Sequence, residues 1–107
     1  MPDCTQRLHQ DRPRLESMAS GHLTLVLRDN VDWSAFESFA KDFLSVHGGE
    51  ALSRADTPVE RVWTVQLRGV KFWLSFDDFH NRYELNARDD EGDKILSALA
   101  ADFSKDR

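Results

Sequence analysis

The segment 59–76 limits the fold more than any other part of this chain. Apolar and polar residues alternate over 59–67 and again over 70–76, a period of two that predicts β-strands with one buried face. A single Arg-Gly pair separates the two runs, and two-residue connections are the commonest links of β-hairpins. When Leu67 is paired with Val70, the apolar residues of both strands fall on one face. The segment therefore predicts an antiparallel hairpin in this register.

A helix over residues 33–47 is predicted from its phenylalanine spacing. Phe36, Phe39 and Phe43 recur at steps of three and four residues, which places them on one helix face. Asp32 suits the N-cap, and the Gly-Gly pair that follows the segment suits a left-handed helix end. We expect the phenylalanine face to pack on the apolar face of the hairpin.

Alternating segments at 22–28 and 82–87, with a short strand at 50–55, complete the expected sheet. The order is then β-α-(β)-β-β-β-α, which predicts an α+β two-layer sandwich. Its antiparallel sheet has four to five strands, and both helices lie on one face. Residues 1–20 are polar and contain two prolines, so we expect a flexible leader. Residues 21–107 are expected to form a single domain, because a chain of 107 residues is too short for two stable cores.

A last helix is expected to follow an aspartate cap at Asp89 or Asp90. Acidic residues in its first turn favour the positive end of the helix dipole. Gly92 weakens that turn by up to about 1 kcal/mol relative to alanine. The face expected to be buried carries Ile95, Ala98, Leu99, Asp102 and Phe103.

Composition excludes several classes of function. The net charge is −5, and residues 77–93 hold seven acidic residues against two arginines, whereas binding to a nucleic-acid backbone requires a basic stripe. No apolar run approaches the roughly 20 residues of a membrane helix, and residues 1–20 lack the apolar region of a secretory signal. Cys4 is the sole cysteine, so neither an internal disulfide nor a zinc-binding cysteine cluster is expected. We therefore expect a cytoplasmic protein with no cofactor and no nucleic-acid or membrane partner.

Trp73 is a large aromatic residue at a position where the alternation calls for a polar one. Since Phe72 and Leu74 take the core side, the indole is expected on the opposite, open face of the sheet. A large aromatic residue there is typical of a partner or dimer surface. Alternatively, the indole lies flat over the Lys71 stem or under the leader and is only structural. The candidate partner-binding residues are Val26, Val62, Thr64, Lys71 and Trp73.

The C-terminal third of the chain carries a candidate acidic patch. Its members are Asp77, Asp78, Asp89, Asp90, Glu91 and Asp93. Asp77, Asp78 and His80 are residue types that a divalent metal or an acid–base pair uses, but a polar turn requires the same types. The later run lacks the ligand spacing of an EF-hand and is explained by helix capping. We assign no catalytic or metal-binding residue, while noting that the negative field favours a basic partner.

Two stretches of sequence carry a family resemblance. WTVQLRGVKFWLSFD and DDEGDKILSALAADF resemble a small family of uncharacterised gammaproteobacterial proteins, and the resemblance covers about residues 22–103. It implies a bacterial protein of α+β fold. Because that family has no assigned activity, the resemblance transfers no functional residue.

These observations leave two classes of function. The first is a non-enzymatic protein-interaction module that uses the Trp73 face to bind an unknown protein partner or a second copy. A variant of it is an acidic inhibitor that binds a basic partner through residues 77–93. The second class is a small metal- or ligand-binding enzyme with a site near Asp77, Asp78 and His80.

Overall fold

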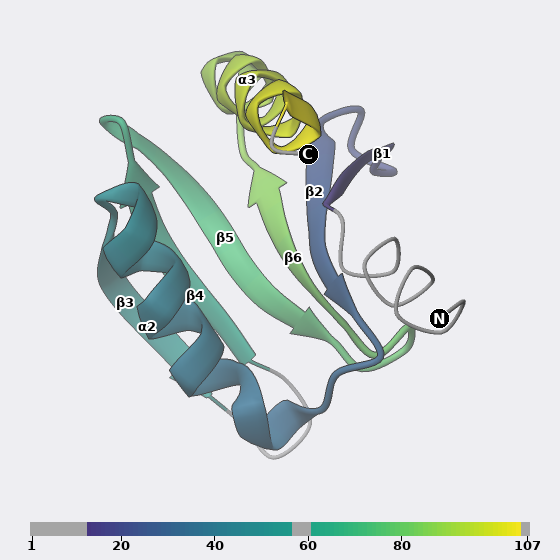
Figure 1. The fold of residues 1–107 in the computed structure, drawn as a ribbon, viewed down its shortest axis with the longest axis vertical. Coiled ribbons are helices and arrows are strands. Elements are labelled where there is room, and N and C mark those ends of the chain that lie inside the picture. The colour runs from purple at the N-terminus through teal and green to yellow at the C-terminus, as the bar shows by residue number, and fades with distance from the viewer. Residues whose placement is uncertain (1–12, 57–60, 106–107) are drawn as a thin grey trace.

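The computed structural model describes residues 13–56 and 61–105, and it shows an open antiparallel sheet with α-helices packed on it (Figure 1). The strands lie side by side in the order β1-β2-β6-β5-β4-β3. Among the described residues, no helix combines the length and hydrophobicity needed to cross a lipid bilayer. The elements are β1 (Arg14–Ser17), β2 (Leu23–Asp29), the 3-10 turn η1 (Trp33–Ala35), α2 (Phe36–His47), β3 (Glu50–Asp56), β4 (Arg61–Leu67), β5 (Val70–Asp77), β6 (Arg82–Ala87) and α3 (Asp90–Lys105).

The α+β class with an antiparallel sheet is confirmed, but the expected four to five strands and their order were wrong. The described chain has six strands and begins with two of them before the first helix. The additional strand is β1, which lies in the segment expected to be a flexible leader. Its four residues are mostly exposed and so leave no apolar pattern; pairing with β2, with Leu15 opposite Leu25, defines the strand. Residues 1–12 of the expected leader lie outside the described residues.

The hairpin has the register that the sequence predicts. Leu67 of β4 pairs with Val70 of β5, and the strand expected at 50–55 is present as β3. Arg68 and Gly69 have φ values of 53° and 79°, and two positive φ angles are what a type I′ turn requires. The hairpin thus turns its apolar face toward the helices, as the alternation predicts.

Helix α2 begins and ends where the sequence predicts a cap. The Asp32 side chain accepts a hydrogen bond from the Ala35 backbone N–H at 3.3 Å, although the first turn is 3-10 rather than α-helical. At the other end, Gly48 is left-handed with φ of 69°. Phe36 is fully buried, with its ring edge-on to Trp63 and Tyr83 at centroid distances of 5.5 and 5.4 Å.

Helix α3 is capped as expected, but it buries a different face. The Asp89 carboxylate accepts a hydrogen bond from the Gly92 N–H at 2.8 Å. Leu96 and Leu99 enter the core, whereas Ala98 and Asp102 are exposed, so the predicted face was wrong at those two positions. The reason is that α3 docks through Gly92, which is buried against β6 and directs Leu96 into the core.

Candidate functional site

Trp73 lies on the open face of the sheet, the face opposite the side chains that pack with the helices. Its neighbours Phe72 and Leu74 are fully buried in the core, and strand alternation directs the indole to the other side. The side chain is 43% exposed. The Arg88 guanidinium lies 4.8 Å from the ring centroid, so a cation already contacts the indole.

A surface hollow of about 490 Å³ adjoins this indole. Two hydrogen bonds order its polar side chains: Asn86 donates to the Ser75 hydroxyl at 3.0 Å, and Thr24 donates to the Asn86 side-chain oxygen at 2.6 Å. The strand pairing of β4, β5 and β6 therefore builds a fixed recess beside an exposed aromatic ring. We call it the Trp73 hollow, and its principal lining residues are Val62, Trp73, Ser75, Asp78, Glu84 and Asn86.

Carboxylates dominate one end of the Trp73 hollow. Arg82 donates to Glu84 at 2.7 Å and to Glu16 at 2.9 Å, and its Nε lies 3.8 Å from the Asp77 carboxylate. Burial raises the pKa of Glu84 above its usual value, and the hydrogen bond from Arg82 opposes that rise. Asp78 is exposed at the same end. The Arg82 guanidinium thus pairs with three carboxylates, and a fourth, that of Asp78, lies at the same end of the hollow.

The structure places four of the five expected contact residues where a partner could reach them. Val62 and Thr64 are half-buried, and Lys71 and Trp73 are exposed. Val26 is only 1% exposed and cannot serve as a contact residue, so this expectation is corrected. The physical reason is that Val26 lies between its cross-strand partners, Arg14 of β1 and Glu84 of β6, on this face of the sheet.

The turn at 77–81 is held by its own hydrogen bonds. The Asp77 carboxylate accepts from the backbone N–H groups of Phe79 and His80 at 3.0 and 3.4 Å, and it pairs with the His80 ring at 2.7 Å. These bonds lower the pKa of Asp77, although burial opposes them. Asn81 has a positive φ of 54°, which suits an asparagine in a turn. Local geometry therefore accounts for these polar residues.

The expected acidic patch is divided into two groups at opposite ends of strand β6. Asp77 pairs with Arg82 at the start of β6, whereas Asp89 follows the end of the strand. Six residues of extended strand separate the groups by about 20 Å. Asp77 and Asp78 therefore belong to the Trp73 hollow, and the group from Asp89 to Asp93 belongs to the start of α3.

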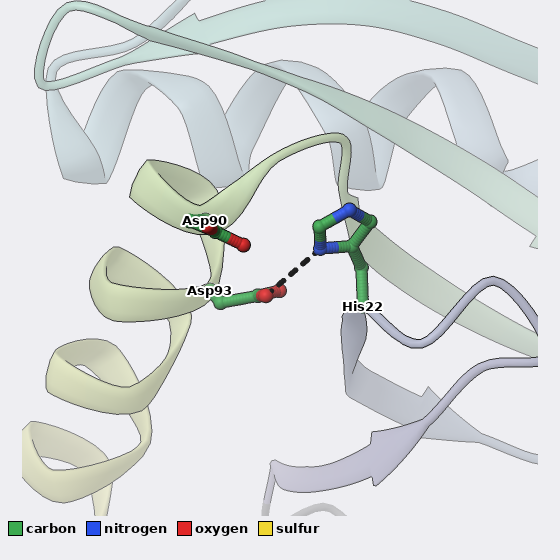
Figure 2. Close-up of side chains that lie close together, drawn as sticks. All are labelled: His22, Asp90 and Asp93. Atoms are coloured by element: carbon green, nitrogen blue, oxygen red, sulfur yellow. Dashed lines mark hydrogen bonds and ion pairs between the residues drawn. The ribbon is translucent and has the colours of Figure 1, made fainter.

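A cluster that sequence reasoning missed joins β2 to α3. His22, Asp90 and Asp93 place their ligand atoms within 4.8 Å of one another (Figure 2). The His22 Nδ1 lies 2.9 Å from one Asp93 oxygen, and the Leu23 N–H donates to the other at 2.8 Å. The hydrogen bond raises the pKa of His22 and lowers that of Asp93. These contacts anchor the helix, and no signal reveals a pairing across 71 positions of sequence.

The protein matches the family described as "Protein of unknown function (DUF3630)" over residues 14–103. The chain belongs to the DUF3630 family. The match begins at β1 and ends within α3, so it contains the Trp73 hollow and the His22 cluster. No curated protein and no solved structure matches the chain. The resemblance to an uncharacterised family is thereby confirmed, and the functional argument for this DUF3630 protein rests on its own surface.

Proposed function

We propose that this DUF3630 protein is a non-enzymatic interaction module that binds a protein partner through the open sheet face around Trp73. The observation that supports the proposal is the 43% exposure of an indole on a well-paired central strand. Tryptophan is enriched among the residues that contribute most to protein interfaces, since it buries a large area with few rotatable bonds. The Trp73 hollow adds a concave feature that a partner side chain can fill.

The purely structural alternative for Trp73 has less support. Of the described residues, Arg88 makes the cation contact with the indole, and it leaves nearly half of the side chain exposed. The indole buries just over half of its surface, and 43% exposure is large for a tryptophan, a residue type that is highly buried on average. Its exposure beside a recess favours a contact that forms with another molecule.

The two other functions receive different support from the geometry. An acidic inhibitor that uses all of residues 77–93 would need one continuous surface, and the charges lie in two groups instead. Asp77 and Asp78 nevertheless adjoin the Trp73 hollow, so an acidic contribution fits within the leading proposal. An enzyme centred on Asp77 and His80 would need these groups for chemistry, whereas their hydrogen bonds hold the turn.

Affinity capture from a lysate of the native cell tests the proposal with Trp73→Ala and Phe79→Ala compared side by side. Phe79 is 86% exposed on the β5–β6 turn, so its truncation removes a similar apolar area away from the hollow. We expect Trp73→Ala to weaken partner binding about tenfold or more, as for a central interface aromatic, and Phe79→Ala to retain it. Circular dichroism should show that both variants are folded. Equal capture by the two variants would refute the proposed surface.

A further inference from the structure

We propose that the Trp73 hollow receives a lysine or arginine side chain from a basic segment of the partner, an inference that rests on the interaction function above. The hollow joins the two groups that bind organic cations in proteins. The first is an indole, whose face attracts cations, and the second is a set of carboxylates, which pair with them. The recess lies between these groups and is open to solvent.

Arg88 shows that this indole accepts a guanidinium. The cation of the chain itself lies 4.8 Å from the ring centroid, although Arg88 has no carboxylate partner among the described contacts. Its position is therefore explained by the attraction of the ring. A partner cation in the Trp73 hollow would meet the same ring and, in addition, the carboxylates that Arg88 does not reach.

The charge around the hollow favours a cation over an anion or a neutral group. Arg82 pairs with Glu16, Asp77 and Glu84, and Arg14 also pairs with Glu16 at 3.1 Å. Together with the exposed Asp78, four carboxylates therefore face two guanidinium groups. This imbalance leaves an excess of carboxylates at one end of the open face. An incoming ammonium or guanidinium group would compensate that excess.

The other polar groups of the hollow are already engaged with one another. Asn86 bonds to both Thr24 and Ser75, which fixes its amide in one orientation. Asp78, whose carboxylate has no partner among the described residues, therefore offers free acceptors for a ligand. Lys71 and Arg88 lie toward the opposite end of β5 and β6, so the face has a charge gradient that would orient a basic segment with its cation toward Asp78.

The experiment is an NMR titration of the ¹⁵N-labelled full-length protein with a capped peptide of alternating serine and arginine. The indole N–H signal of Trp73 reports on the hollow, while those of Trp33 and Trp63 serve as internal references. We expect a saturable shift at Trp73 that weakens as salt is added. Asp78→Asn and Glu84→Gln should each weaken binding about threefold to fivefold, as for a partly exposed ion pair. Asp42→Asn makes the same change of charge at an exposed position of α2 and should leave binding unchanged.

Three outcomes would overturn the cation assignment. The Trp73 signal could remain unmoved, it could respond equally when citrulline replaces arginine in the peptide, or the three acidic-residue variants could bind alike. An equal affinity for free spermidine would instead overturn the assignment to a protein side chain, because a small cation would then fill the hollow as well. If any of these occurs while Trp73→Ala still abolishes capture of the native partner, the interaction function stands. If Trp73→Ala has no effect on capture, the interaction function fails as well.

Discussion

His22 and Asp93 form an ion pair whose contribution to stability depends on pH. The hydrogen bond that His22 donates to Asp93 raises the folded-state pKa of His22. The contribution of the histidine is therefore complete below its unfolded pKa of about 6.5 and is lost as pH rises through the raised pKa. The pKa of Asp93 is lowered, so its contribution is present above about pH 4 and disappears as pH falls through the lowered value. The pair therefore stabilises the fold most between about pH 4 and 6.5.

We expect His22→Gln to reduce the free energy of unfolding more at about pH 5.5 than at about pH 8.5, as measured by urea denaturation at both values. His47→Gln provides a control of opposite sign. Burial and nearby Arg68 lower the pKa of His47, so protonation of this residue destabilises the fold as pH falls. His47→Gln should therefore change the free energy of unfolding more favourably at about pH 5.5 than at about pH 8.5. An identical effect of His22→Gln at both pH values would show that the ion pair does not contribute.

At the scale of elements, the docking of α3 on the sheet requires a glycine. A Cβ added at Gly92 would lie 3.1 Å from the Cβ of Ala87 and 3.3 Å from its Cα. The gain in helix propensity on Gly92→Ala is at most about 1 kcal/mol, whereas overpacking against strand backbone costs about 1–3 kcal/mol. We therefore expect Gly92→Ala to destabilise the protein by about 1 kcal/mol, the reverse of what propensity alone predicts.

Chemical denaturation of the Gly92→Ala and Ala98→Gly variants distinguishes the effect of packing on stability from the effect of helix propensity. Ala98 is exposed on the same helix, so its replacement by glycine should cost about 1 kcal/mol through propensity alone. Both substitutions are expected to destabilise. A Gly92→Ala protein more stable than the wild type would mean that α3 shifts freely on β6.

Elements with a local signature could be predicted from the sequence, and elements defined by distant partners could not. The β4–β5 register follows from alternation and a two-residue turn, which are both visible within 18 consecutive positions. Strand β1 has no such pattern, because its residues are mostly exposed and its stability comes from β2. The buried face of α3 was misjudged at Ala98 and Asp102 for a similar reason, since the close approach of Gly92 to β6 sets the rotation of the helix.

The candidate site likewise combines features that could be predicted from the sequence with features that could not. The outward position of Trp73 follows from its place between two core residues, and that part of the surface could be predicted. The burial of Val26, the ordered amide of Asn86 and the separation of the acidic residues depend on which strands are neighbours. Sequence reasoning could therefore locate the aromatic centre of the surface but not its boundary or its charge distribution.

At the scale of the whole molecule, β1 is an edge strand of the sheet, and its side chains form ion pairs with neighbouring strands. Its Arg14 bonds to Asp29 at 2.6 Å, and its Glu16 pairs with Arg82 at 2.9 Å. In register, Arg14 also lies opposite Val26, whose side chain is 1% exposed. The described sheet therefore includes β1, although the sequence assigns this segment to a leader.

A truncation series tests this boundary. A chain that begins at residue 19 loses β1, whereas a matched chain that begins at residue 13 keeps it. We expect the shorter chain to be about 2 kcal/mol less stable, because Val26 becomes exposed to water, and the longer one to serve as its reference. Urea denaturation measures the difference, and faster hydrogen exchange along β2 would locate it. If both truncated chains unfold at the same urea concentration, β1 adds nothing to the folded unit, and the cover over Val26 must come from elsewhere.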